Sequence, residues 1–253
     1  KKIKNRSYSY LFTFQPEMIG TIAFLAHNEK LIKKIQYGMF TEMIGTPGRP
    51  VLQKSFQENT SIDTTSFNIM MKKYNGNIEV KNFLEDCIVN DELILCHSGI
   101  HIPTVSFNRG NFFEYHTSGD NYDILDFDLI KDFSDTQLEI IKEMEKNCYL
   151  ATPFERIPPR KTPANRYQEA IDYNSNDYIP IPKFKGPIFL SKYGLYVDIN
   201  DNPSLNTIID KIMIRINGVN SCADIAKQVG INFLIVDEQL KKYYNKSLIE
   251  IKK

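Results

Sequence analysis

Strand-like and helix-like segments alternate over the first 149 residues, and this alternation most restricts the fold. Apolar stretches typical of strands lie at 37–45 and 102–107, and a shorter strand is expected at 78–84. Residues 8–14 alternate aromatic or apolar residues with small polar ones, which predicts a further strand. Strands that alternate with helices favour a layered α/β/α domain with a mostly parallel sheet.

Helices are expected where a start signal precedes an apolar stripe. One helix follows the first predicted strand, with Glu17 in its first turn, where the helix dipole favours a carboxylate. Thr60 or Ser61 can cap a second helix. The sequence Ser-Asp-Thr-Gln at 134–137 is typical of a capping box and marks a long third helix.

The domain organisation follows from a change of pattern near residue 150. We assign residues 1–150 to the α/β domain. Seven prolines make 151–187 a proline-rich, ordered linker. Three short helical patterns and a terminal strand in 188–253 are typical of a winged-helix domain.

Composition excludes several classes of partner. With 42% hydrophobic residues and a net charge of zero, the chain has an ordinary globular composition and no global field that attracts nucleic acid or an anionic membrane. The third C-terminal helix carries Asp237 and Glu238 in its first half and its lysines near its end. Acidic residues in the first half of such a helix repel the phosphates of DNA, which is unfavourable for DNA recognition. Nucleic acid is therefore not expected as a partner.

Location and redox state follow from what the sequence lacks. It contains no run of about 18 apolar residues and no signal-peptide pattern, so we expect a cytoplasmic protein without a membrane partner. The four cysteines are scattered and form no Cys-x-x-Cys pair, which favours reduced structural thiols. The chain starts without Met and enters a predicted strand at once, so we expect upstream sequence to be missing.

The loop 111–121 contains the best candidate for a metal ligand or catalytic imidazole, His116. Oxygen acceptors at Thr117, Ser118 and Asp120 could fix its ring orientation and tautomer. The alternative is a loop histidine that titrates freely. His97 and His101 flank a turn at Gly99 and are interpreted as ordinary loop histidines.

Acidic residues interrupt or end the predicted strands. Glu42 lies in an apolar segment, so its carboxylate must be exposed, paired or bound to a cation. Glu17, Glu42, Asp91 and His116 all follow or end predicted strands, and the carboxyl ends of parallel strands lie at one edge of a sheet. These four residues could therefore converge on one site.

Several motifs together resemble a bacterial family of aminopeptidase-like proteins, in which a zinc-aminopeptidase fold is joined to a C-terminal winged helix. The motifs are Phe-Thr-Phe-Gln-Pro-Glu-Met-Ile-Gly-Thr-Ile at 12–22, Gly-Met-Phe-Thr-Glu-Met-Ile-Gly at 38–45, Ile-Pro-Thr-Val-Ser-Phe at 102–107, Glu-Tyr-His-Thr-Ser-Gly-Asp-Asn at 114–121, and Lys-Gly-Pro-Ile-Phe-Leu-Ser at 185–191 with Gly-Leu-Tyr at 194–196. The block around His116 is the most specific of them.

The resemblance implies roles for individual residues. His116 matches the last zinc ligand and Glu42 a ligand acid, with one or two zinc ions as the cofactor. Glu17 stands where such enzymes carry a Glu-Glu pair, and the resemblance implies that it is the general base. Asp91 and Tyr115 are expected to bind substrate. An upstream histidine and a bridging aspartate are also implied, and this chain offers no position for either.

The sequence supports two alternative functions. The first is a zinc-dependent aminopeptidase-like hydrolase that cleaves an amide or peptide bond in a small peptide or amide-containing small molecule. The second is a catalytically incomplete binding or scaffold protein with the same fold, in a polysaccharide or secondary-metabolite pathway. The sequence leaves a homo-oligomer open.

Overall fold

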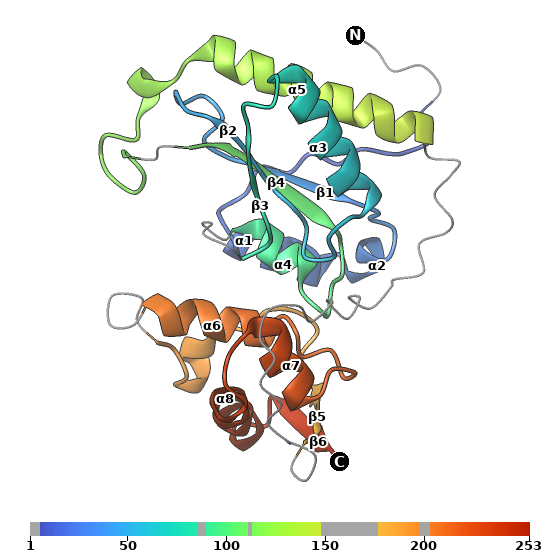
Figure 1. Ribbon diagram of the computed structural model, residues 1–253, viewed down its shortest axis with the longest axis vertical. Coiled ribbons are helices and arrows are strands. Elements are labelled where there is room, and N and C mark those ends of the chain that lie inside the picture. Colours follow the sequence, from blue (N-terminus) through green and yellow to red (C-terminus); the bar gives the residue numbers. More distant parts are fainter. Residues whose placement is uncertain (1–5, 85–89, 111–112, 148–176, 198–202) are drawn as a thin grey trace. The chain divides into compact units, whose positions relative to one another are not determined.

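The computed structural model describes residues 6–84, 90–110, 113–147, 177–197 and 203–253 (Figure 1). The chain divides into two compact units. The N-terminal unit comprises Lys1–Cys96 and Ile102–Arg156, and the C-terminal unit comprises His97–His101 and Ile157–Lys253. Most of the linker predicted at 151–187 lies outside the described residues.

A four-stranded mixed sheet forms the centre of the N-terminal unit. Its strand order is β1 (Gly38–Thr41), β4 (Thr104–Arg109), β2 (Pro50–Gln53) and β3 (Glu79–Lys81). The pairs β1–β4 and β2–β3 are parallel, whereas β2 and β4 are antiparallel. The predicted α/β class is confirmed. Strand β2 was not predicted, because four residues that begin with proline and lie beside Gly- and Pro-rich sequence resemble a loop.

Helices cover both faces of this sheet (Figure 1). On one face lie α3 (Ser61–Lys73) and α5 (Phe127–Asn147), and on the other lie α1 (Ile19–His27) and α4 (Asp91–Cys96), with α2 (Glu29–Ile32) following α1. All six residues of β4 are buried. In the core under α3 and α5, the Phe107 ring packs edge-on against Phe133, with 5.6 Å between ring centroids.

The strand predicted at 8–14 is wrong. In the described structure this segment is irregular, and no sheet includes it. Glu145 holds its first part, because the Ser7 backbone N–H and the Tyr10 hydroxyl donate to that carboxylate at 2.7 Å and 2.5 Å. Leu11, Phe12 and Phe14 are exposed. The alternating pattern was misleading because no strand lies alongside to bury one of its faces.

The predicted start of the long helix is also wrong. Helix α5 begins at Phe127, and the short 3₁₀ turn Tyr122–Ile124 precedes it. The Asp126 carboxylate accepts the backbone N–H groups of Asp128 and Leu129, at 2.8 Å and 3.2 Å. Ser134 lies inside the helix, where its hydroxyl donates to the Ile130 carbonyl at 2.8 Å. The serine therefore bonds back to the preceding turn, which a capping pattern alone does not exclude.

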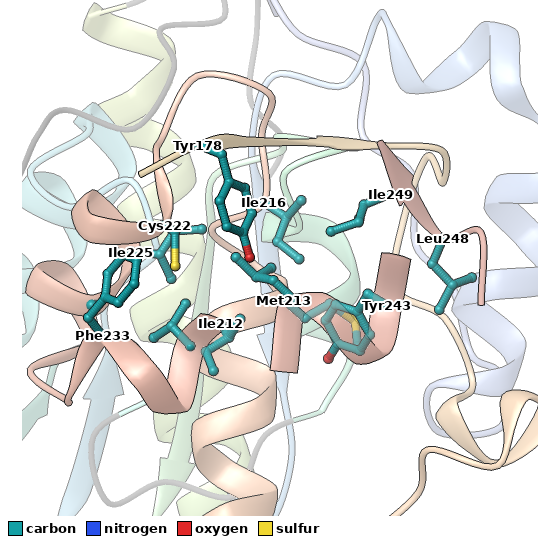
Figure 2. Packing of buried hydrophobic residues seen from close by; sticks show 13 residues of the cluster. Tyr178, Ile212, Met213, Ile216, Cys222, Ile225, Phe233, Tyr243, Leu248 and Ile249 are labelled. Atoms are coloured by element: carbon teal, nitrogen blue, oxygen red, sulfur yellow. The ribbon is translucent and has the colours of Figure 1, made fainter. Parts of the chain in front are cut away.

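The C-terminal unit packs three helices against a two-stranded sheet. Its elements are the 3₁₀ turn Leu190–Tyr193, α6 (Pro203–Met213), α7 (Cys222–Val229), α8 (Phe233–Asn245) and the antiparallel strands β5 (Ile179–Pro182) and β6 (Ile249–Lys252). The three predicted helices and the terminal strand are confirmed. Figure 2 shows side chains from α6, α7, α8 and β6 meeting Tyr178 in one apolar core. Strand β5 falls inside the range predicted as linker.

The turn His97–His101 belongs to this C-terminal unit, although its sequence lies between α4 and β4. The Ser98 hydroxyl donates to the Ile216 carbonyl at 2.9 Å, and the His97 ring packs edge-on against Phe184. A Cβ atom at Gly99 would overlap the Lys185 carbonyl, so only glycine fits that close approach. His97 lies in this turn, as expected from the sequence, and its side chain is buried, with 1% exposed.

Burial of His97 makes the stability of the C-terminal unit depend on pH. Desolvation, with a smaller contribution from His101, lowers the pKa of the His97 imidazole to about 3. A histidine with a lowered folded-state pKa stabilises the fold above its unfolded pKa of about 6.5, and this stability is lost as the pH falls. Between pH 7 and pH 5 we expect a loss of about 2 kcal/mol.

Hydrogen exchange of the α6 and α7 amides in the intact chain at both pH values measures this loss. His97→Gln should remove it, whereas His27→Gln, at the exposed end of α1, should keep it. Equal pH dependence in the parent and His97→Gln would contradict the assignment.

No helix within the described ranges has both the length and the apolar character needed to cross a bilayer.

Candidate functional site

The candidate site begins where β1 ends. The Glu42 backbone N–H donates to the Phe107 carbonyl at 3.1 Å, which fixes Glu42 directly beyond the paired part of β1 and β4. Its side chain is half-buried. The Asn90 side-chain amide donates to Glu42 Oε1 at 2.7 Å. The sequence left the Glu42 carboxylate exposed, paired or bound to a cation. In the structure it is partly buried and paired with the Asn90 amide through a hydrogen bond.

The start of α4 supplies further acidic groups. Asn90, Asp91 and Glu92 are buried, with exposures of 0%, 7% and 0%. Glu92 Oε1 accepts from Gln53 Nε2 at 2.9 Å and from the Asn90 backbone N–H at 3.2 Å. Asn90 therefore bonds to both Glu42 and Glu92, and Gln53 at the end of β2 bonds to Glu92.

Burial and the charges of nearby acidic residues raise the pKa of both glutamates. Burial raises the pKa of Glu42 to about 7, with the charge of Glu92 next in size and further contributions from Glu17 and Asp91, while the hydrogen bond from Asn90 acts in the opposite direction. Burial also raises the pKa of Glu92 to about 7, and Asp91 adds to this. Near neutral pH this cluster therefore takes up and releases protons.

Glu17 and Tyr115 complete the group. Glu17 is exposed and lies just before α1. Burial raises the pKa of Tyr115, and the charges of Glu17 and then Glu42 raise it further. The Tyr115 phenol is therefore protonated and can donate a hydrogen bond close to two carboxylates.

Four of the predicted site residues are linked by their charges, and His116 contacts this group through Tyr115. The charges of Glu17 and Asp91 act on Glu42, and the charges of Glu17 and Glu42 act on Tyr115. His116 is exposed, has a φ of 57°, and stacks on the Tyr115 ring with 3.8 Å between centroids. Across the described ranges, no group of three or more His, Cys, Asp or Glu side chains is placed to hold a metal ion. The zinc ligands His116 and Glu42 stay a prediction.

The sequence analysis missed three residues of this site: Gln53, Asn90 and Glu92. The triplet Asn90-Asp91-Glu92 precedes an apolar run, which is typical of a helix start and would have predicted α4. No local signal pairs Glu92 with Gln53, because they are 39 residues apart and meet only through the sheet. Asp91 begins this helix and does not end a strand.

Comparison with known proteins identifies a family that this chain matches. Residues 1–147 match the family model described as Domain of unknown function (DUF4910). A curated protein from Clostridium acetobutylicum, named as a candidate polysaccharide biosynthesis protein with an aminopeptidase-like domain, is 32% identical over 148 residues. The alignment covers 58% of this chain and 33% of that protein. The chain thus spans about a third of the length of this relative.

A solved structure from Clostridium acetobutylicum, described as a candidate peptidase, aligns with 93% of this chain and 46% of its own. Its TM-score is 0.47 at 20% sequence identity. The aminopeptidase-like domain in the curated relative's name agrees with the resemblance found from sequence motifs. Because the family model matches more than half of the chain, the protein belongs to the DUF4910 family.

Proposed function

We propose that this chain forms part of a peptidase-like hydrolase that cleaves an amide bond in a small peptide or an amide-containing small molecule. The observation that supports the proposal is electrostatic: the charges of Glu17 and Asp91 act on Glu42, which follows β1, and the charges of Glu17 and Glu42 act on Tyr115. The aminopeptidase-like domain in the name of the curated relative supports the same class of reaction.

Three of these residues, Glu17, Tyr115 and Asp91, can divide the reaction between them. Glu17 is exposed to water and acts as the general base that takes a proton from the attacking water molecule. The Tyr115 phenol donates a hydrogen bond to the carbonyl oxygen, on which negative charge develops. The water oxygen bonds to the carbonyl carbon, the C–N bond breaks, and the leaving amine takes the proton from Glu17. Asp91 attracts the substrate ammonium group by charge.

None of these steps requires the zinc ions that the resemblance implies. Zinc in hydrolases needs three protein ligands arranged around one point, and the described residues provide no such group. Glu42 is hydrogen-bonded to Asn90, and His116 stacks on Tyr115. Zinc binding by His116 and Glu42 remains a separate prediction, which elemental analysis of the parent and His116→Ala checks directly.

Glu17→Gln is expected to lower kcat for aminoacyl anilides by about 10² to 10⁴-fold, because the variant lacks the general base. Glu139→Gln, on the exposed face of α5, is the matched control and should behave like the parent.

A second function has one observation in its favour. His116 is exposed and outside any group of metal-ligating side chains in the described structure. A catalytically incomplete binding or scaffold protein fits this arrangement, and the curated relative's name suggests a polysaccharide pathway. Folded protein without turnover of any aminoacyl anilide, in the parent as in Glu17→Gln, would contradict the hydrolase and favour this alternative.

We further propose that the C-terminal unit is a winged helix that acts as a packing or partner-binding module. Three helices and an antiparallel strand pair support this assignment. Lys241 pairs with Asp237 at 2.7 Å and Lys242 with Glu238 at 3.0 Å, so neighbouring acids offset the positive charge on α8. The phosphate backbone of DNA would therefore be attracted only weakly to α8.

A further inference from the structure

Four buried oxygen atoms around Glu92 have no hydrogen-bond donor among the described residues. They are Glu92 Oε2, Asn90 Oδ1, Asp91 Oδ1 and Gln53 Oε1. Buried acceptors of this kind are rare in native proteins, because each loses its hydration without compensation. The four atoms come from two short segments, the end of β2 and the start of α4.

Asn90 connects this group to Glu42. Its side-chain amide donates to Glu42 Oε1 at 2.7 Å, and its backbone N–H donates to Glu92 Oε1 at 3.2 Å. The two carboxylates are thus held on either side of one residue. Both bonds use the Oε1 atoms, while Glu92 Oε2 and the amide oxygen of Asn90 lack a donor. Glu92 is fully buried, so solvent does not compensate its second oxygen.

Positive charge is also missing from this group. Within the described ranges, the lysine and arginine ion pairs of the N-terminal unit involve Glu79, Asp132, Asp135 and Glu143, and none involves Glu42 or Glu92. A buried carboxylate at Glu92 and a half-buried one at Glu42, without a cationic partner, are costly to the fold. A bound cation would compensate their charge, and the oxygen atoms that lack a hydrogen-bond donor could coordinate it.

We propose that Glu42, Asn90 and Glu92 form a binding site for a hard divalent cation of the Ca²⁺ type. All the donor atoms are carboxylate or amide oxygens, which are the ligands Ca²⁺ prefers, and Ca²⁺ accepts irregular geometry more readily than Mg²⁺. Zinc prefers nitrogen and sulfur ligands, and this group contains neither. The site shares Glu42 with the zinc prediction but does not include His116, and it does not depend on the hydrolase proposal.

Calorimetric titration of the chelator-treated, intact chain with CaCl₂ tests the site. We expect saturable binding at one site, and Glu92→Gln should weaken it by about tenfold or more, because a charged ligand is replaced by a neutral one. Glu139→Gln and His116→Ala should bind Ca²⁺ like the parent. Absence of calcium binding, or binding unchanged in Glu92→Gln, would overturn the proposal. The proposal would also be overturned if the parent chain bound zinc but not calcium and His116→Ala lost the zinc.

A second variant separates ligand loss from misfolding. Asn90→Asp replaces an amide by a third carboxylate, so calcium should raise the melting temperature of this variant more than that of the parent. A smaller calcium-induced shift than in the parent would count against Asn90 as a ligand. The hydrolysis assay has a different readout, so failure of the cation site and failure of the hydrolase proposal are distinguishable.

Discussion

Phe107→Ala is expected to lower the free energy of unfolding of the N-terminal unit by about 3 to 5 kcal/mol. Phe107 lies on the central strand β4, is fully buried, and packs edge-on against Phe133. Removal of the ring forfeits the burial of its apolar surface and leaves a cavity between the sheet and α5, which a strand paired on both sides cannot close. The effect should be among the largest for any single substitution in the chain.

Urea unfolding followed by far-UV circular dichroism, with hydrogen exchange of the β4 amides, measures this effect. Phe113→Ala is the matched control, since Phe113 is 84% exposed and its removal should change stability by less than about 0.5 kcal/mol. Similar losses in the two variants would show that Phe107 does not hold the core together in solution.

Asp63→Ala is expected to cost the N-terminal unit about 3 kcal/mol. The carboxylate is 1% exposed and accepts four hydrogen bonds, from the backbone N–H and hydroxyl groups of Ser55 and Thr60, at 2.6 to 3.0 Å. Alanine removes one half of the capping box of α3. It also leaves the buried N–H of Ser55 without an acceptor, which is the larger part of the cost.

The same unfolding measurement tests this prediction, with two controls. Asp63→Asn keeps the shape and one side-chain acceptor, so its loss should be smaller than that of alanine. Asp135→Ala removes an exposed ion pair with Lys131 on α5 and should cost less than about 1 kcal/mol. Equal stability of Asp63→Ala and Asp135→Ala would mean that the carboxylate does not cap α3.

Features that depend on neighbouring residues in sequence could be predicted, and those that depend on distant residues could not. Thr60 or Ser61 was expected from nearby residues to cap a helix, and Thr60 caps α3. The segment 8–14 has a strand pattern but remains unpaired in the described structure, because pairing requires a neighbour that no local pattern supplies. Strand β2 shows the opposite case, a weak pattern that forms a strand between β4 and β3.

The candidate site follows the same division. Glu42 could be recognised because a carboxylate in an apolar segment needs compensation, and Asn90 provides a hydrogen bond to it. The partner itself could not be predicted, since it lies 48 residues away and reaches Glu42 through the start of α4. His97 had no signal of burial in its own sequence, which has the small residues of a turn. In the folded unit its ring packs against Phe184, far along the chain.

The position of the His97–His101 turn in the sequence limits how genes for such proteins can recombine. The C-terminal unit takes its residues from two places in the gene, because this turn is encoded between α4 and β4. A recombination event that transfers only residues 157–253 would leave the Ile216 carbonyl without the Ser98 hydroxyl and the Phe184 ring without His97. The five-residue turn and the C-terminal sequence are therefore expected to be inherited together.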